Sequence, residues 1–238
     1  MRKLFLFTIL LIAGVSAMAQ RGVMTFSVTE FKLPDSLARQ MDTLESRSGL
    51  PLENMFRQVH LNVYFKPDFT RTEVTIMNGV IKLNYYWNRG SNEVMLFSDV
   101  FGRRTKVKLD PLAMGTLNAD EIAEEDLHIQ RFPEDHKTIM GLPVQRVRVS
   151  SSANGPGIDL FVCPSLKIPF VGYGIEQFTT DLLGGTPLGY RLNEGPLAVQ
   201  FEVTKLENHV DEAAFRLPGG YTEKSMEEYM QEFGSFLH

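Results

Sequence analysis

Alternation of apolar and polar residues recurs along this chain and constrains its fold more than any other feature. In QVHLNVYF (58–65) every second residue is apolar: Val59, Leu61, Val63 and Phe65. RTEVTIMNGVIKLNYYW (71–87) contains two such runs around Asn78-Gly79, the dipeptide most typical of a type I′ turn, whose central residues both need positive φ. A period of two places alternate side chains on opposite faces of a strand. The pattern therefore predicts antiparallel hairpins.

The same pattern predicts further strands along most of the chain. They cover 22–31, 93–99, 102–109, 127–132, 144–149, 157–162 and a hairpin over 190–207 that turns at 193–196. The segment Pro133–His136 is interpreted as a turn, because Pro133 closes the strand before it. Pro143 is expected to limit pairing at the start of the strand that follows.

Two amphipathic helices are expected to flank this sheet. One covers DSLARQMDTLE (35–45), and the other covers 223–237 with Thr222 as its N-cap. The acidic segment 115–128 predicts either a third, short helix capped by Asn118 or a loop. The expected fold is α+β and mainly β, with two or three helices, in a single domain over residues 20–238.

The N-terminus has the three parts of a secretory signal. Arg2 and Lys3 precede an apolar run over 4–15, and Ala17-Met18-Ala19 follows. We expect a signal peptide over 1–19, cut between Ala19 and Gln20; the alternative is a retained interfacial anchor. No cysteine adjoins the cut, which predicts no N-terminal lipid. The chain is expected in the periplasm, or otherwise exported, in a gram-negative bacterial envelope.

Charge argues against a nucleic-acid-binding protein, and the cysteine content excludes a protein with an internal disulfide. The net charge of −5 becomes more negative once Arg2 and Lys3 leave, which argues against nucleic acid as a partner. The basic run 102–108 is interpreted as a solvated strand face rather than an anion site. Cys163 is the single cysteine, so an internal disulfide is excluded, and its apolar strand predicts a buried thiol.

The candidates for chemistry are weak. His128 and His136 lie among acids, but their spacing matches no compact metal site, and we interpret the segment as a solvated turn. The acids concerned are Glu124, Glu125, Asp126, Glu134 and Asp135. With no catalytic motif present, the sequence predicts no enzyme, no cofactor and no metal. Asp35-Ser36-Leu37 and Asp42-Thr43-Leu44 resemble periplasmic O-glycosylation acceptors, although chance and helix capping also explain them.

Four segments together resemble a known group of exported proteins. They are LNVYFKPDFTRTEV (61–74), KTIMGLPVQRVRV (137–149), GTPLGYRLNEGPLAVQFEVTKLE (185–207) and FRLPGGY (215–221). They resemble LolA-like periplasmic proteins and the related exported families that include the GLPGLI-type group, over most of 57–221. The insert at 34–48 and FVCPSL (161–166), where the GLPGLI-type group often has a W-Y-T-like strand, depart from that pattern.

The resemblance implies a single antiparallel sheet curled into a LolA-like half-barrel, with helices on or in its concave side. The lipoprotein carrier of that group uses the concavity for acyl chains. By analogy, the resemblance implies an exported binding or carrier protein for an acyl chain, lipid or other apolar ligand. The alternative is a structural or interaction protein with a filled barrel that docks to an envelope partner. Either one allows peripheral contact with a membrane, and neither fixes the oligomeric state.

Apolar residues on the second face of the predicted sheet mark the candidate binding site. They are Tyr64, Tyr86, Met95, Phe97 and Phe161, all out of phase with the main apolar set. Water does not tolerate a large apolar face, so either the two helices cover it or it lines a pocket for an apolar ligand. Trp87 adjoins Tyr86 and is expected to report a bound apolar probe through its emission.

Overall fold

The structure is a computed structural model, and it describes residues 21–32, 39, 58–109, 128–150, 157–168, 180–194 and 197–236. The signal segment with its cut between Ala19 and Gln20, the acidic segment up to residue 127, and Ser36 and Thr43 lie outside the described residues. Of the helix expected at 35–45 only Arg39 is described, and it is helical. Within the described part of the chain, no helix is both long enough and apolar enough to cross a membrane.

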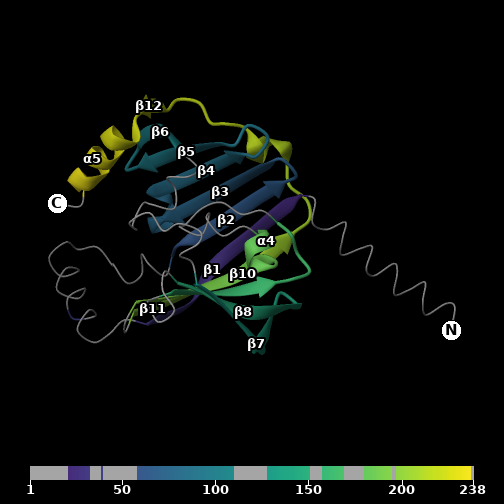
Figure 1. The fold of residues 1–238 in the computed structure, drawn as a ribbon. Helices are drawn as coiled ribbons and strands as arrows, with labels where there is room; N and C mark the ends of the chain where they lie inside the picture. The colour runs from purple at the N-terminus through teal and green to yellow at the C-terminus, as the bar shows by residue number, and fades with distance from the viewer. Residues whose placement is uncertain are drawn as a thin grey trace.

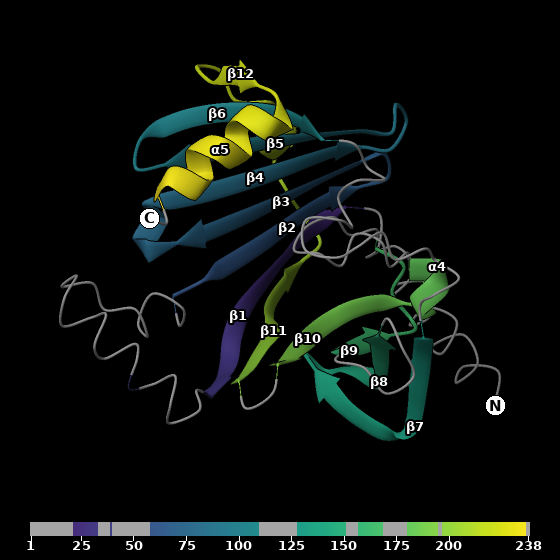
Figure 2. The same cartoon turned by 60° about the vertical axis from the view of Figure 1, so that its left-hand side comes forward.

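Within the described residues, twelve strands form one sheet in the order β12-β6-β5-β4-β3-β2-β1-β11-β10-β9-β8-β7. The strands are β1 Gly22–Lys32, β2 His60–Lys66, β3 Phe69–Ile76, β4 Ile81–Asn88, β5 Glu93–Val100, β6 Arg103–Leu109, β7 His128–Ile139, β8 Leu142–Ser150, β9 Gly157–Cys163, β10 Thr186–Glu194, β11 Leu197–Glu207 and β12 Thr222–Lys224. The sheet bends strongly, so that β7, β8 and β9 lie well away from β4, β5 and β6 (Figures 1 and 2). The expectation of a mainly β, curled and open sheet is confirmed.

Every pairing except that of β12 with β6 is antiparallel, as the alternation predicts. The Asn78-Gly79 turn is confirmed: φ is 50° at Asn78 and 90° at Gly79, and the Val80 N–H donates to the Met77 carbonyl over 3.2 Å. These are the features of a type I′ turn. The hairpin of β10 and β11 also forms as expected.

The interpretation of Pro133–His136 as a turn is wrong. β7 runs without a break from His128 to Ile139, and its register with β8 shifts between Phe132 and His136. A bulge of this kind absorbs the extra residues and lets the strand continue past Pro133. The chain reverses instead at Met140 and Gly141, where φ is 53° and 77°.

The two faces of the sheet differ in what they bury. The first face carries the main apolar set, and Leu61, Val63, Val74 and Leu160 on it are fully buried. Residues that pair directly on neighbouring strands lie on the same face, so this face continues from Val63 through Thr72 and Tyr85 to Leu96. The second face runs in parallel from Asn62 through Glu73 and Asn84 to Phe97. The predicted separation of the two apolar sets is therefore confirmed.

The C-terminal part of the chain wraps around the β6 edge and contacts both faces. The 3-10 helix η4 (Glu212–Phe215) lies on the second face, β12 pairs with β6 at the edge, and helix α5 (Met226–Phe236) lies along β4, β5 and β6 on the first face (Figure 2). Met226 and Tyr229 of α5 pack against Val94, Leu96, Val107 and Leu109. The Tyr229 hydroxyl lies 3.1 Å from Ser98 Oγ.

One expectation about helices is corrected by this arrangement, and another is not confirmed. Thr222 is not the N-cap, because it belongs to β12; Ser225 caps α5, with its Oγ accepting from the Glu228 N–H over 3.1 Å. The Glu228 carboxylate accepts in return from the Ser225 N–H over 2.8 Å, which completes a capping box. The number of two or three helices is not confirmed: besides α5, the described residues contain α4 (Thr180–Leu183) and two 3-10 helices, η4 and η1 (Met77–Gly79).

Candidate functional site

The structure brings four of the five predicted site residues together. Tyr64, Tyr86, Met95 and Phe97 lie on the second face, on β2, β4 and β5. Phe161 is also on the second face, but β3, β2, β1, β11 and β10 lie between its strand β9 and β4. The amine of Lys137 is 3.5 Å from the Phe161 ring centroid, so this ring has a separate, charged surrounding.

A chain of aromatic rings covers the second face over β3, β4 and β5. Tyr86 meets Phe97 at 5.2 Å between ring centroids, and Phe97 meets Tyr221 at 5.2 Å. Phe69 contacts Tyr86 at 6.0 Å and Phe215 at 5.8 Å. All four pairs are edge-to-face, the arrangement that ring quadrupoles favour. Tyr86 and Phe97 are left only 3% and 2% exposed.

Within the described residues, the cover of this face comes from a segment near the C-terminus of the chain and not from helix α5. We call residues Val210–Tyr221 the cover segment; it contains η4, Phe215 and Tyr221. The alternative in which the helix at 223–237 covers the second face is wrong, because α5 packs on the first face. Sequence reasoning missed Phe215 and Tyr221 as site residues, although FRLPGGY was noted for its resemblance.

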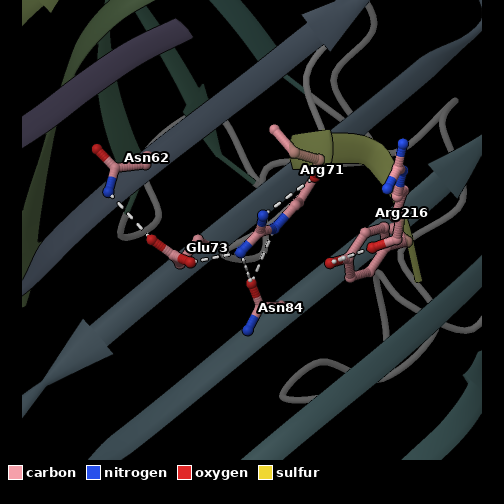
Figure 3. A network of polar contacts seen from close by, with 7 residues as sticks. Asn62, Arg71, Glu73, Asn84 and Arg216 are labelled. Atoms are coloured by element: carbon pink, nitrogen blue, oxygen red, sulfur yellow. Dashed lines mark hydrogen bonds and ion pairs between the residues drawn. The ribbon is translucent and has the colours of Figure 1, made fainter. Parts of the chain in front are cut away.

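A network of hydrogen bonds around Arg71, which we call the polar clasp, also holds the cover segment on the sheet (Figure 3). The Arg71 Nη1 donates to the Ala214 carbonyl over 3.0 Å. Its Nε and Nη2 donate to Asn84 Oδ1 over 3.0 and 2.7 Å, and Nη2 also reaches Glu73 over 2.5 Å. The clasp extends through Asn62, which donates to Glu73 over 3.3 Å.

Two tyrosines add to the clasp. The Tyr86 hydroxyl donates to the Arg216 carbonyl over 3.3 Å (Figure 3). The Arg71 guanidinium carbon lies 5.0 Å from the Tyr64 ring centroid and 5.5 Å from that of Tyr86. Burial raises the pKa of both tyrosines above the ordinary value. The site is therefore aromatic, with Arg71 paired to Glu73 at its centre and a second cation, Lys66, 4.6 Å from the Phe215 ring centroid.

As far as they are described, the other sequence candidates form no comparable site. His128 and His136 are both exposed on β7, and Asp135 pairs with Arg146 at 3.0 Å. Among the described residues, no three side chains of histidine, cysteine, aspartate or glutamate are grouped to hold a metal. Cys163 is fully buried, with its sulfur 3.2 Å from Ser165 Oγ, as its apolar strand predicts. Lys106 and Lys108 of the basic strand pair with Glu223 and Glu93 at 2.8 Å each, which fits a solvated strand face.

Comparisons with known proteins give no family. No protein-family model matches the chain, and no curated protein matches it. Among solved structures, PNGF-II is similar at 17% identity and a TM-score of 0.49, over 90% of this chain and 33% of the other. LprF from Mycobacterium bovis is similar at 13% identity and a TM-score of 0.32, over 87% and 93%. This chain spans about a third of the length of the PNGF-II chain, and both scores are too low to support a function.

Proposed function

We propose that this chain is an exported, non-enzymatic binding protein of the cell envelope with a self-covered site on its second face. The observation that carries the proposal is the contact of Phe215 and Tyr221 with Phe69 and Phe97. These two rings of the cover segment lie where an apolar ligand would bind. The ligand class that fits is an amphiphile with an apolar tail and an anionic head.

The apolar half of this proposal rests on the rings below the cover segment. Without Phe215 and Tyr221, the rings of Phe69, Tyr86 and Phe97 would face solvent over three neighbouring strands. Water tolerates such a surface poorly, so an apolar tail that replaces the cover would be held by the same contacts. Pockets for small ligands are mainly apolar with few polar anchors, which describes this surface.

The anionic half rests on Arg71. Its Nη1 binds the Ala214 carbonyl at 3.0 Å, and that donor is released when the cover segment leaves. A guanidinium binds a carboxylate or phosphate through two parallel hydrogen bonds. Only 18% of the Arg71 side chain is exposed, and partial burial strengthens its electrostatic interactions. Glu73 and Asn84 keep their bonds to Nε and Nη2, so an anionic head would be bound through the released Nη1.

The cover segment has the features of a part that can separate from the sheet. It contains one short 3-10 helix, and most of its residues after Phe215 are exposed, with Leu217 57% exposed. Regions with few buried apolar contacts open at a lower free energy than the core. On the first face, by contrast, residues such as Leu61 and Val63 are fully buried.

Export and the carrier role come from the sequence. The signal pattern at 1–19 and the LolA-like segments support an envelope location, and the curled, open, mainly β sheet supports a half-barrel. N-terminal sequencing of exported protein tests the first point: Gln20 as the first residue is expected, and Met1 would refute it.

The alternative function is an interaction protein with a permanently closed cover. The observation that favours it is the 3% and 2% exposure of Tyr86 and Phe97, because a filled face leaves no room for a tail. In that case the outer surface of the cover segment would meet an envelope partner. The two functions differ in whether loosening the cover creates a binding site.

The deciding experiment compares three variants in binding palmitate after lipid removal. A double variant, Phe215→Ala with Tyr221→Ala, is expected to bind more tightly than the unchanged chain, and adding Arg71→Gln is expected to abolish the gain. Leu217→Ala, a change at an exposed position of the same segment, is the control and should bind as the unchanged chain does. No binding by the folded double variant would reject the carrier role and leave the interaction protein.

A further inference from the structure

Two hairpin tips form an exposed apolar edge at one end of the sheet. The β3–β4 tip presents Val80, which is 39% exposed, and the β5–β6 tip presents Phe101, which is 59% exposed. The two tips are joined because the Phe101 N–H donates to the Val80 carbonyl over 3.1 Å. Ile81 and Val100, which pair across β4 and β5, follow inward from the tips, and Val100 is buried.

The backbone at Phe101 is unusual for so large a side chain. Phe101 and Gly102 have φ of 52° and 82°, and the pairing of Val100 with Arg103 makes them the two central residues of the turn. Positive φ at both positions favours Asn-Gly, and a bulky residue there is strained. A Cβ added to Gly102 would meet nothing within 4 Å, so the tip projects into open space. An exposed aromatic ring therefore stands at a turn position whose backbone conformation asparagine would adopt with less strain.

Cationic side chains flank this apolar edge on both faces. Arg103 and Arg104 are 64% and 57% exposed, and Lys82 is exposed beside them on β4. Arg104 pairs with Asp99 at 3.1 Å and Arg103 with Glu232 at 3.4 Å, which leaves one more positive than negative charge at the edge. Long cationic side chains around an aromatic tip suit the boundary between lipid headgroups and acyl chains.

We propose that these tips, Met77–Val80 and Phe101–Arg104, form a membrane-contacting edge that inserts Phe101 and Val80 into an anionic lipid surface. The apolar side chains supply most of the attraction, and the small excess of positive charge adds a weaker preference for anionic headgroups. Phe101 and Val80, which carry the proposal, belong neither to the chain of aromatic rings nor to the polar clasp, although the Arg104 guanidinium carbon lies 6.0 Å from the Tyr221 ring centroid. The edge would place a carrier beside the membrane with which it exchanges its cargo.

The test measures binding to vesicles of phosphatidylethanolamine with phosphatidylglycerol, using protein purified after export. Phe101→Asn is expected to lower the affinity about ten-fold, since a buried aromatic side chain is worth at least that factor. The variant keeps the fold, because Asn-Gly is the preferred pair for this turn. Val80→Ser gives a second, independent reduction at the neighbouring tip.

The matched control is the same change in the same kind of turn elsewhere. Met140 precedes Gly141 with φ of 53° and 77° and is 48% exposed, so Met140→Asn should bind vesicles as the unchanged chain does. Arg103→Gln with Arg104→Gln should weaken binding to the anionic vesicles and leave binding to phosphatidylcholine vesicles unchanged. Vesicle binding that is absent from the unchanged chain, unaffected by Phe101→Asn, or equally reduced by Met140→Asn would overturn the proposal.

Discussion

Phe97 of β5 and Tyr221 of the cover segment meet edge to face, with ring centroids 5.2 Å apart and ring planes at 87°. The contact fastens a segment near the end of the chain to β5, close to the β12 edge of the sheet. This contact and the neighbouring ones leave only 2% of Phe97 exposed. The strength of this one pair therefore bears directly on whether the cover segment is firmly or loosely held.

Tyr221→Ala is expected to lower the free energy of unfolding by about 2 kcal/mol, because it removes a half-buried ring and its aromatic contact. In a double-mutant cycle with Phe97→Ala, a coupling of about 1 kcal/mol is expected from the ring pair. Chemical denaturation measures both values. Leu217→Ala, at an exposed position of the same segment, should change stability by less than about 0.5 kcal/mol; equal losses at both positions would mean that the ring contact is not what holds the segment.

Arg71→Ala is expected to cost about 2 kcal/mol, since it breaks the bond to the Ala214 carbonyl and leaves Glu73 without this partner. Arg71→Lys should recover part of the loss, because one ammonium cannot reproduce the fork of donors that reaches Asn84 and Ala214 together. Limited proteolysis should show faster cleavage within the cover segment in both variants. Lys205→Gln, which breaks an exposed ion pair with Glu207, is the control and should leave cleavage unchanged.

The stability of this fold should fall in alkaline solution. Burial raises the pKa of Tyr64, Tyr86, Tyr221 and Tyr229 above the ordinary value of 10.0. The folded state therefore holds these protons after the unfolded state has begun to release them. Stability is fully present below pH 10 and is lost as the pH rises from there through the raised values.

Denaturation at a series of pH values checks this dependence, with the Tyr229→Phe variant beside the unchanged chain. The variant loses the hydroxyl contact with Ser98, so it should be less stable at neutral pH but should lose less stability above pH 10. Parallel pH profiles for the two proteins would show that Tyr229 does not contribute to the alkaline loss.

Gly79→Val tests the backbone at the β3–β4 tip. A loss of about 1–3 kcal/mol is expected, because a β-branched residue at positive φ is strained, and φ at Gly79 is 90°. Gly219→Val is the matched control: φ there is not positive, and an added Cβ would meet nothing within 4 Å. A thermal melt that is unchanged for Gly79→Val, or shifted as much for the control, would argue against strain at this turn.

Strand positions could be predicted from the sequence because alternation is a local property. Val59–Phe65 and Asn78-Gly79 show this most clearly, since their faces and turn follow from neighbouring residues alone. Pro133 misled the prediction, because a bulge in β7 absorbs it, and a bulge depends on the partner strand rather than on the proline.

The candidate site could be predicted only in part for the same reason. Tyr64, Tyr86, Met95 and Phe97 were found from their phase along the strands, whereas their cover was not. Phe215 and Tyr221 lie in FRLPGGY, which has neither a period of two nor a helical period, and they reach Phe69 and Phe97 across more than a hundred residues. Amphipathicity likewise predicted helix α5 but not the face of the sheet that it covers.

Trp87 is expected to report helix α5 and not the second face. Consecutive strand residues point to opposite faces, so Trp87 lies on the first face, against the same four residues as Met226 and Tyr229. Tyr229→Ala should shift Trp87 emission to longer wavelength, because it admits water beside the indole. Met230→Ala, on the exposed side of the same helix, should leave the emission unchanged. An apolar probe that binds under the cover segment should leave Trp87 emission nearly unchanged, and a large shift on probe binding would place the probe on the first face instead.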